Sequence, residues 1–329
     1  TTKAFTDYFG KFGFAFARVE AKPQIDRVTN RVEFVLQAEP SRRAYVRRIQ
    51  VAGNDRTRDE VIRREFRQLE AAWYDGDKIR LSRDRVDRLG YFTQVNVETL
   101  EVPGAPDQVD LLFTVAEKPT GSISLGAGFS SAEKVALSFG IRQENAFGSG
   151  NYLAVEVNTS KFNRNLVLST TDPYFTKNGV SRTLDVFQRT TRPYLGDVDA
   201  YSLINSGLGL RFGVPVTETD TVFVGINAEQ TEIREGTGLP DAYRDYAQKF
   251  GATSTALPLT LGWARDGRDS ALVPTSGSLQ RVNADLSVAG DVRYVRASYQ
   301  FQHYYPISKK YTLAFNTDIG WGQGLKGQE

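Results

Sequence analysis

The chain has 329 residues, which is enough for two or three domains, and its formal net charge of +2 argues against a dedicated nucleic-acid binder. It contains no cysteine, which excludes disulfides, thiolate zinc sites and thiol catalysis. Aromatic residues make up 12% of the chain and glycine occurs 29 times, a mixture that suits many strands joined by tight turns. No uncharged apolar run approaches the roughly 18 residues of a membrane-spanning helix, but a spanning barrel strand needs only about 9–11 alternating residues.

Residues 1–39 combine one helix pattern with one strand pair. The spacing i, i+3, i+4, i+7 of a helix face is followed by Phe5, Tyr8, Phe9 and Phe12. Gly13 is a plausible helix end, a strand is expected from Phe14, and Val32 to Leu36 mark its hairpin partner. Because one helix and one hairpin cannot close a core, this segment is interpreted as the end of a domain that begins upstream.

Residues 40–118 are predicted to form a complete β-α-α-β-β unit. A strand over 45–51 ends at Gly53-Asn54, and Thr57 to Glu60 is typical of a capping box that opens a helix. A second helix is expected from about Asp77 to Gly90, followed by strands over 94–102 and 109–115. Phe34 and Pro40 precede Phe113 and Pro119 by about 79 residues, which indicates tandem modules.

Residues 119–329 are predicted to form eleven antiparallel strands. In each, apolar residues alternate with charged, glycine or amide residues, for example over 208–214, 282–288, 295–301 and 311–321. Aromatic residues gather towards strand ends, which favours an apolar face turned outward to lipid over a soluble sandwich. Eleven is an odd number, so we expect a sheet that does not close. Pro240 to Phe250 is the only helix-like insert.

The first of these strands is the point at which the mixed pattern gives way to pure alternation. Its apolar face carries Ile123, Leu125, Ala127 and Phe129, and its other face carries Ser122, Ser124, Gly126 and Gly128, after Gly121. Glycine in a strand lacks packing, so this strand is expected to be a weakly paired one.

Several segments give the chain a resemblance to the BamA family, the barrel subunits of the bacterial outer-membrane β-barrel assembly machinery. The β-α-α-β-β repeat resembles a POTRA (polypeptide-transport-associated) domain. The segments that carry the resemblance are Val46–Asn54, Arg63–Trp73, Leu89–Phe92, Val102–Asp110, Asp172–Phe175 and Pro274–Gly277. The similarity covers essentially the whole chain. The arginine-glycine-aromatic motif of the family's inward-folded loop should lie beyond Glu329.

The resemblance implies a fold class of α+β POTRA domains followed by an antiparallel transmembrane β-barrel. Residues 1–39 would end the fourth POTRA domain, 40–118 would be the fifth, and 119–329 would supply the first eleven or so of sixteen barrel strands. The protein would lie in the bacterial outer membrane with its POTRA domains in the periplasm.

The implied function is to fold and insert other β-barrel proteins by strand templating at a lateral seam, without enzymatic activity, nucleotide, metal or other cofactor. Gly121 to Phe129 would form one lip of that seam, and the strand over 94–102 would hold incoming chains by β-augmentation. Arg63 and Glu70 would dock a BamD-like lipoprotein. The other partners would be unfolded outer-membrane clients and lipid, with no nucleic acid.

Two other classes of function stay open at this stage. A two-partner-type secretion pore would share POTRA domains and barrel, whereas a passive porin would leave the soluble repeats unexplained. An enzyme is disfavoured because no catalytic constellation is visible: Gly126-x-Gly128 precedes no helix, and His303 is the only histidine. Asp266 and Asp269 are interpreted as turn residues, and the arginine-rich run over 42–67 as a solvated face.

Overall fold

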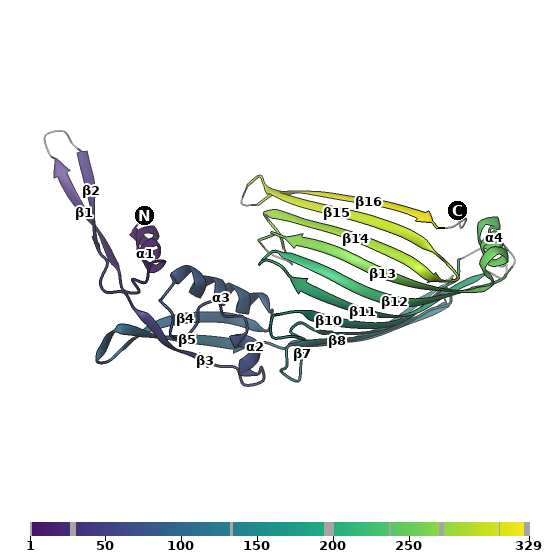
Figure 1. The fold of residues 1–329 in the computed structure, drawn as a ribbon, viewed down its shortest axis with the longest axis horizontal. Helices are drawn as coiled ribbons and strands as arrows, with labels where there is room; N and C mark the ends of the chain where they lie inside the picture. The colour runs from purple at the N-terminus through teal and green to yellow at the C-terminus, as the bar shows by residue number, and fades with distance from the viewer. Residues whose placement is uncertain are drawn as a thin grey trace. The chain divides into compact units, whose positions relative to one another are not determined.

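The computed structural model describes residues 2–26, 31–131, 134–193, 201–236, 238–269, 273–308 and 310–325. The chain divides into two compact units. The first comprises residues 1–120 together with residues 144–150, and the second comprises residues 121–143 and 151–329. Figure 1 shows helices of the first unit beside a small sheet, and one large sheet that makes up most of the second.

The elements of the first unit are α1 (Thr2–Gly10), β1 (Arg18–Asp26), β2 (Arg31–Glu39), β3 (Tyr45–Ala52), α2 (Asp59–Arg63), α3 (Gly76–Arg88), β4 (Phe92–Val102) and β5 (Ala105–Glu117). β1 and β2 form an antiparallel hairpin, while β3, β4 and β5 form a three-stranded sheet in the order β3-β5-β4. β3 runs parallel to β5, and β4 runs antiparallel to it. The predicted β-α-α-β-β order of residues 40–118 is therefore present.

The N-terminal hairpin begins later than its sequence pattern predicts. The prediction of a strand from Phe14 is wrong, because β1 starts at Arg18. Gly13 takes a positive φ of 96°, and the Phe14 amide donates to the Phe9 carbonyl at 3.3 Å, so the chain turns back on the helix before it extends. The ring of Phe14 packs edge-on against Phe9, with centroids 6.1 Å apart.

The core of the first unit lies between the three-stranded sheet and its helices. Leu111 and Phe113 of the central strand β5 are fully buried, and the ring of Phe113 packs at a tilt against Phe66 from the segment after α2, with centroids 4.4 Å apart. Val61 and Ile62 of α2 and Val86 of α3 are also fully buried. Apolar residues at helical spacing thus cover the apolar face of the alternating strand.

The two helices of this sheet start differently. Asp75 caps α3 as its side chain accepts the amides of Asp77 and Lys78 at 3.0 and 3.2 Å. The predicted capping box at Thr57 is wrong, because α2 begins at Asp59 with Arg58 at the N-cap and no side-chain cap bond. The hydroxyl of Thr57 is engaged elsewhere, with Asn145. A capping box needs its first residue at the N-cap, and here the N-cap lies one residue later, at Arg58.

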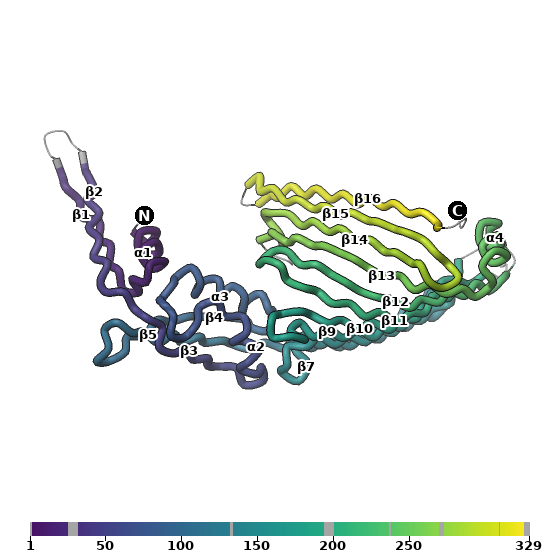
Figure 2. Tube along the Cα trace, in the orientation of Figure 1, coloured from purple at the N-terminus to yellow at the C-terminus, as the bar shows by residue number. Residues whose placement is uncertain are grey.

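The second unit is an eleven-stranded antiparallel sheet. Its strands are β6 (Gly121–Ser130), β7 (Lys134–Ala146), β8 (Asn151–Thr159), β9 (Asn163–Asp172), β10 (Ser181–Thr191), β11 (Ser202–Pro215), β12 (Asp220–Arg234), β13 (Thr253–Asp266), β14 (Gly277–Gly290), β15 (Tyr294–Pro306) and β16 (Thr312–Gly324). They pair in chain order, so β6 and β16 are the two edges and the described sheet is open. The tube in Figure 2 follows this up-and-down path from strand to strand. The predicted number of strands is confirmed.

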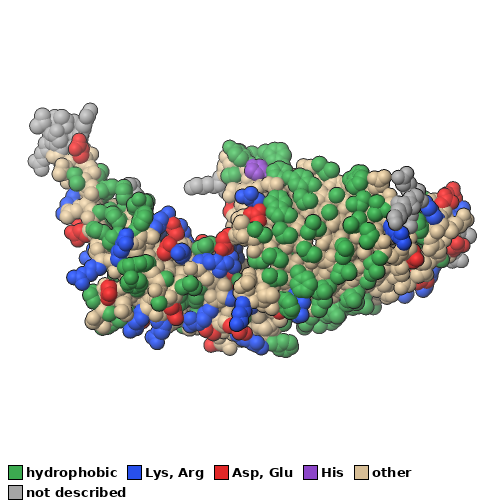
Figure 3. Space-filling view, in the orientation of Figure 1, with side chains coloured by type: hydrophobic (Ala, Val, Ile, Leu, Met, Phe, Trp, Pro, Cys, Tyr) green, Lys and Arg blue, Asp and Glu red, His purple; other side chains and the backbone are tan. Residues whose placement is uncertain are grey.

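Apolar side chains cover a surface of this sheet instead of a core. Leu208, Leu261 and Ile319 keep 54%, 58% and 61% of their surface exposed. In Figure 3 green side chains are spread over the face of the large sheet that is turned to the viewer. Strand alternation therefore produces an outward apolar face, as the sequence predicts. No helix in the described part of the chain is both long enough and apolar enough to cross a membrane.

The predicted helical insert is confirmed as α4 (Asp241–Phe250), in the connection between β12 and β13. It has a small apolar contact of its own, in which Tyr246 and Ala247 pack against buried Tyr201, Ile233 and Leu239. The Tyr246 hydroxyl lies 2.8 Å from the Ser254 hydroxyl at the start of β13.

Candidate functional site

Strand β6 is an edge strand whose second side has no partner strand among the described residues. It pairs only with β7, from Gly121 opposite Gln143 to Ser130 opposite Lys134. All ten of its residues are exposed, and Leu125 and Phe129 keep 79% of their surface accessible. Such an edge presents a row of backbone N–H and C=O groups that can pair with another extended chain.

The two glycines of β6 have different surroundings on its polar face. A Cβ at Gly126 would collide with the Ser138 hydroxyl of β7, whereas a Cβ at Gly128 would meet nothing within 4 Å. A hollow of about 340 Å³ follows the polar side of β6 and its neighbours, where Ser122 and Ser124 line it. The strand is thus lightly packed on the side that carries its small residues.

The three-stranded sheet of the first unit has one closed edge. The segment after α2 runs along β3, where the Ala71 amide donates to the Val46 carbonyl at 2.7 Å and the Val46 amide to the Ala72 carbonyl at 3.0 Å. Tyr45 stacks on Trp73 with ring centroids 3.8 Å apart. β3 is therefore already paired along this stretch and cannot accept a further strand there.

Glu70 and Arg63, the residues expected to dock a partner, lie on this closing segment and at the end of α2. Arg63 Nη1 is 3.8 Å from Glu70 Oε1, and Arg63 also hydrogen-bonds Asp59. About half of the Glu70 side chain is exposed, as is a comparable part of Arg63. The structure thus brings the two side chains together at the surface.

Sequence reasoning missed a second contact of Glu70. Its Oε1 accepts a hydrogen bond from the Ile49 amide at 2.7 Å, so the carboxylate also satisfies the edge of β3. β3 and β5 shift register between Val46 and Arg48, next to this amide. No local pattern reveals the contact, because a bulge and an amide 21 residues away have to meet.

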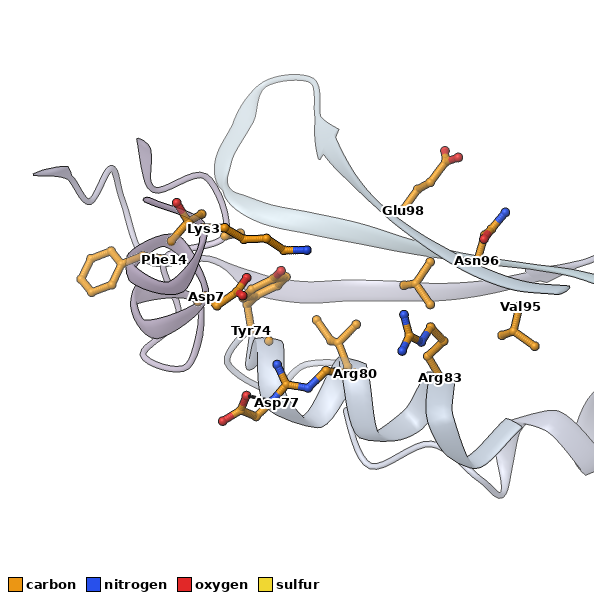
Figure 4. Close-up of a pocket in the computed structure, with 16 residues that line it drawn as sticks. Lys3, Asp7, Phe14, Tyr74, Asp77, Arg80, Arg83, Val95, Asn96 and Glu98 are labelled. Atoms are coloured by element: carbon orange, nitrogen blue, oxygen red, sulfur yellow. Dashed lines mark hydrogen bonds and ion pairs between the residues drawn. The ribbon is translucent and has the colours of Figure 1, made fainter. Parts of the chain in front are cut away.

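The other edge of the small sheet, β4, is open and borders a groove. β4 pairs only with β5 within the described residues. A cavity of about 720 Å³ lies along Val95 to Glu98, between this strand, α3 and α1. Figure 4 shows Arg80 and Arg83 of α3 on one side of the groove and Asn96 and Glu98 of β4 on the other.

An ion pair holds the end of this groove. Lys11, just after α1, contacts Asp77 of α3 at 2.7 Å. The hydrogen bond from Lys11 lowers the pKa of Asp77 below its usual value, against the opposing effect of burial. Arg80 contacts the same carboxylate at 2.5 Å. The groove therefore has fixed charges at its rim and an extended strand edge along its length.

The remaining polar residues singled out from the sequence are structural where the structure describes them. Asp266, the last residue of β13, is bound by Arg268 at 2.7 Å. Asp269 accepts from the Thr275 and Ser276 amides at 2.9 and 3.1 Å and is a turn residue beside that strand end, as predicted. His303 lies within β15 opposite Phe315 and stacks on Phe301. In the described ranges no group of three or more His, Asp or Glu side chains is arranged to hold a metal ion.

Comparison with known families matches two segments of the chain. Residues 145–329 match the Omp85 superfamily domain, and residues 44–118 match the POTRA family described as a surface antigen variable number repeat. The second match falls on the three-stranded sheet and its helices, and the first begins near the end of β7.

Individual relatives and solved structures agree with these matches. The chain is 38% identical over 326 residues to the outer membrane protein assembly factor BamA of Neisseria meningitidis, and 27% identical over 321 residues to that of Nitratidesulfovibrio vulgaris. These alignments cover 96% and 97% of this chain but only 41% and 39% of the relatives.

Two solved structures resemble the fold. The structure of BamA from Haemophilus ducreyi lacking POTRA domains 1–3 superposes with a TM-score of 0.73 at 26% identity, covering the whole of this chain and 64% of that one. CdiB from Acinetobacter baumannii reaches a TM-score of 0.57 at 11% identity, over 95% of this chain and 58% of that one, and so shares the fold alone.

Proposed function

Because the chain belongs to the Omp85 superfamily, we propose that it acts as an outer-membrane protein assembly factor that folds and inserts β-barrel proteins. Both curated relatives described above carry that name. The protein would lie in the bacterial outer membrane with its POTRA domains in the periplasm, and would work without nucleotide or other cofactor.

The observation that carries this proposal is the combination, in one chain, of a POTRA unit with an up-and-down sheet whose apolar side chains face outward. We assign the templating step to β6: in lipid every backbone polar group must find a partner, so a strand that releases one neighbour has to take up another. A client strand can satisfy these groups by adding to β6 in an antiparallel or parallel ladder. The light packing at Gly128 favours exchange of one partner strand for another, because a glycine-bearing strand forms a weaker sheet.

The open edge of β4 suits an earlier step of the same activity. β3 is closed by residues 70–74, so that an extended client segment can join the small sheet only at β4. The groove along Val95 to Glu98 has room for the side chains of such a segment. A photo-crosslinking residue at Asn96 should therefore capture unfolded clients, whereas one at Arg47 of β3 should capture far fewer. Equal capture at both positions would contradict this role of β4.

A crosslinking experiment tests the templating step. The chain has no cysteine, so a cysteine at Ser124 of β6 can be paired with one in the last strand of a small barrel client during assembly into liposomes. We expect a disulfide between the two proteins. The matched control is Ser138→Cys, an exposed serine on the polar face of the neighbouring strand β7. Assembly that proceeds with no crosslink at Ser124, or with equal crosslinking at Ser138, would contradict strand templating at the edge of β6.

We further propose that Arg63 and Glu70 dock an assembly lipoprotein of the BamD type. Glu70→Lys should weaken capture of that partner by placing a second cation beside Arg63. Glu70→Gln retains an acceptor for the Ile49 amide and so separates the charge from the fold. Glu60→Lys on α2, with 71% of its side chain exposed, is the control for a change of surface charge. Unchanged binding by Glu70→Lys would leave Glu70 with its role at the edge of β3 alone.

A further inference from the structure

The end of β7 and the turn that leads to β8 belong to the first compact unit, although β8 and the rest of β7 belong to the second. Residues 144–150 group with residues 1–120, and the first three of them are the last residues of β7. This segment, called the β7–β8 turn below, has the sequence Glu-Asn-Ala-Phe-Gly-Ser-Gly. The following contacts all lie within that first unit.

Asn145 is the centre of this turn's attachment. Only 6% of its surface is exposed, and its side chain is bonded at both ends. Its Nδ2 donates to the Thr57 hydroxyl at 2.9 Å, and its Oδ1 accepts from the Gly150 amide at 2.7 Å. Thr57 is 3% exposed and lies 88 residues away in the chain. A buried amide with both ends satisfied specifies one arrangement, because any other leaves polar atoms unpaired.

Backbone contacts hold the other half of the turn. The Arg58 amide donates to the Gly148 carbonyl at 3.0 Å, and the Tyr91 hydroxyl donates to the Gly150 carbonyl at 3.3 Å. Gly148 has a positive φ of 71°, and a Cβ there would collide with the Arg56 carbonyl. Glycine is required at this position for both its conformation and its close approach to the neighbouring backbone.

Thr57 also connects the turn to the end of β5. The Glu117 carboxylate accepts the Thr57 and Arg56 amides at 2.7 and 3.0 Å. Burial acts to raise the pKa of Glu117, but these bonds and one from the Thr57 hydroxyl outweigh it, so the pKa lies below its usual value. Three residues further on, the Thr120 carbonyl accepts the Glu144 amide at 2.9 Å. Both connections of the chain to β6 and β7 therefore pass through one bonded network.

The conformation of Phe147 is further evidence that the turn is held in place. This residue has a positive φ of 53° with 93% of its surface exposed. No burial of its own ring stabilises that backbone conformation, which is uncommon for a bulky residue. The bonds of Asn145 and Gly148 lie on either side of it, as expected where the surroundings hold an unfavourable backbone conformation.

We propose that Asn145 and Thr57 are positioning residues that fasten the β7–β8 turn within the POTRA unit and thereby set the register of the β6–β7 hairpin, the templating edge. β6 pairs with β7 over its whole length, so the register of one end of β7 sets the register of the templating edge. This role rests on the proposed function, whereas the fastening itself does not.

The test compares three variants of the protein by amide exchange and by client assembly in liposomes. Thr57→Val removes the hydroxyl at nearly constant volume, Asn145→Ala removes both side-chain bonds, and Thr57→Ser restores the hydroxyl. Exchange at Arg58 and Gly150, read on peptides covering 53–60 and 144–151, should be about tenfold faster in the first two, because each loses a buried hydrogen bond. Thr57→Ser should exchange as the natural protein does.

Client assembly should fall severalfold in Thr57→Val and Asn145→Ala and return in Thr57→Ser. The control Asp172→Ala removes the bond that Asp172 accepts from the Tyr174 amide in the β9–β10 turn, at the same end of the sheet, and should leave both readouts unchanged.

Unchanged exchange at Arg58 and Gly150 would overturn the fastening. Faster exchange with full assembly would overturn the positioning role. A loss of assembly as large in Asp172→Ala would also overturn it, since any turn would then matter equally. If Asn145→Ala fails to fold, Thr57→Val and Thr57→Ser decide the outcome. If the natural protein assembles no client, the proposed function and the positioning role are both refuted. The exchange data would still show whether Asn145 and Thr57 fasten the turn.

Discussion

The two sheets of this chain use the same two-residue alternation in opposite ways. In the three-stranded sheet Leu111 and Phe113 are fully buried beneath α2 and α3. In the eleven-stranded sheet Leu208 and Leu261 keep more than half of their surface exposed. Alternation shows only that the two faces of a sheet differ in polarity. Whether the apolar face is buried in a protein core depends on what covers it. Helices of the same chain cover one sheet, and under the proposed function lipid covers the other.

The largest expected effect comes from a substitution in the buried face of the three-stranded sheet. Phe113→Ala should destabilise the first unit by about 3–5 kcal/mol, because it leaves a cavity beside Phe66 and loses a buried ring. Denaturant unfolding followed through amide exchange of β5 would measure it. Leu261→Ala on the exposed face is the matched control and should change stability far less. Equal losses would show that the two faces are covered alike.

A charge on the outward face gives the next largest effect. Leu261→Arg should cost about 2–4 kcal/mol near the middle of a bilayer, and should lower the folded fraction in lipid vesicles. Ser298→Arg on the polar face is the control. That face already holds charge, since Asp285 binds Arg296 at 2.7 Å and Thr260 at 2.8 Å. A tolerated arginine at 261 together with a damaging one at 298 would reverse the assignment of the two faces.

A smaller effect is expected from a substitution in the edge strand β6. Gly128→Ala should strengthen β6 by about 0.5–1 kcal/mol, since a strand alanine is less flexible than glycine and its Cβ meets nothing within 4 Å. If a weak edge serves exchange of partner strands, client assembly should slow while the β6–β7 amides exchange more slowly. Faster assembly by this variant would mean that the weakness of β6 has no role.

The smallest expected effect is a pH dependence of the first unit through Glu117. Its pKa is depressed in the folded state, so its contribution is complete above the ordinary glutamate value of 4.5 and is lost as the pH falls through the folded pKa. Denaturant midpoints at pH 6 and pH 4 would measure this loss. In Glu117→Gln the denaturant midpoint should depend less steeply on pH. A pH dependence identical to that of the natural protein would show that Glu117 does not cause it.

The elements of the fold follow closely from local pattern. The strand alternation of residues 119–329 predicts eleven strands and an outward apolar face, and the apolar spacing of residues 40–118 predicts the order of the smaller unit. Gly90, expected after α3, has the positive φ of 74° that a helix end favours. These features depend on neighbours within a few residues, which a sequence displays directly.

The candidate functional site follows less closely from the sequence. β6 is identifiable as the first strand, but its edge position depends on the pairing of the whole sheet. The closure of β3 by residues 70–74 and the opening at β4 are visible in no single segment, because each requires two distant stretches to meet. Arg63 and Glu70 were selected by resemblance, and only the structure shows that Glu70 also bonds the Ile49 amide.

Thr57 shows most directly where local pattern ends and tertiary structure begins. By itself the sequence determined which strands and helices form and in what order, because hydrophobic period and turn chemistry are properties of neighbouring residues. It also suggested a helix cap at Thr57, which is a local use of a hydroxyl. In the structure that hydroxyl accepts from Asn145, 88 residues away, and both ends of the buried Asn145 amide are thereby bonded. Only tertiary structure could decide between them, since the competing partner is absent from the local sequence.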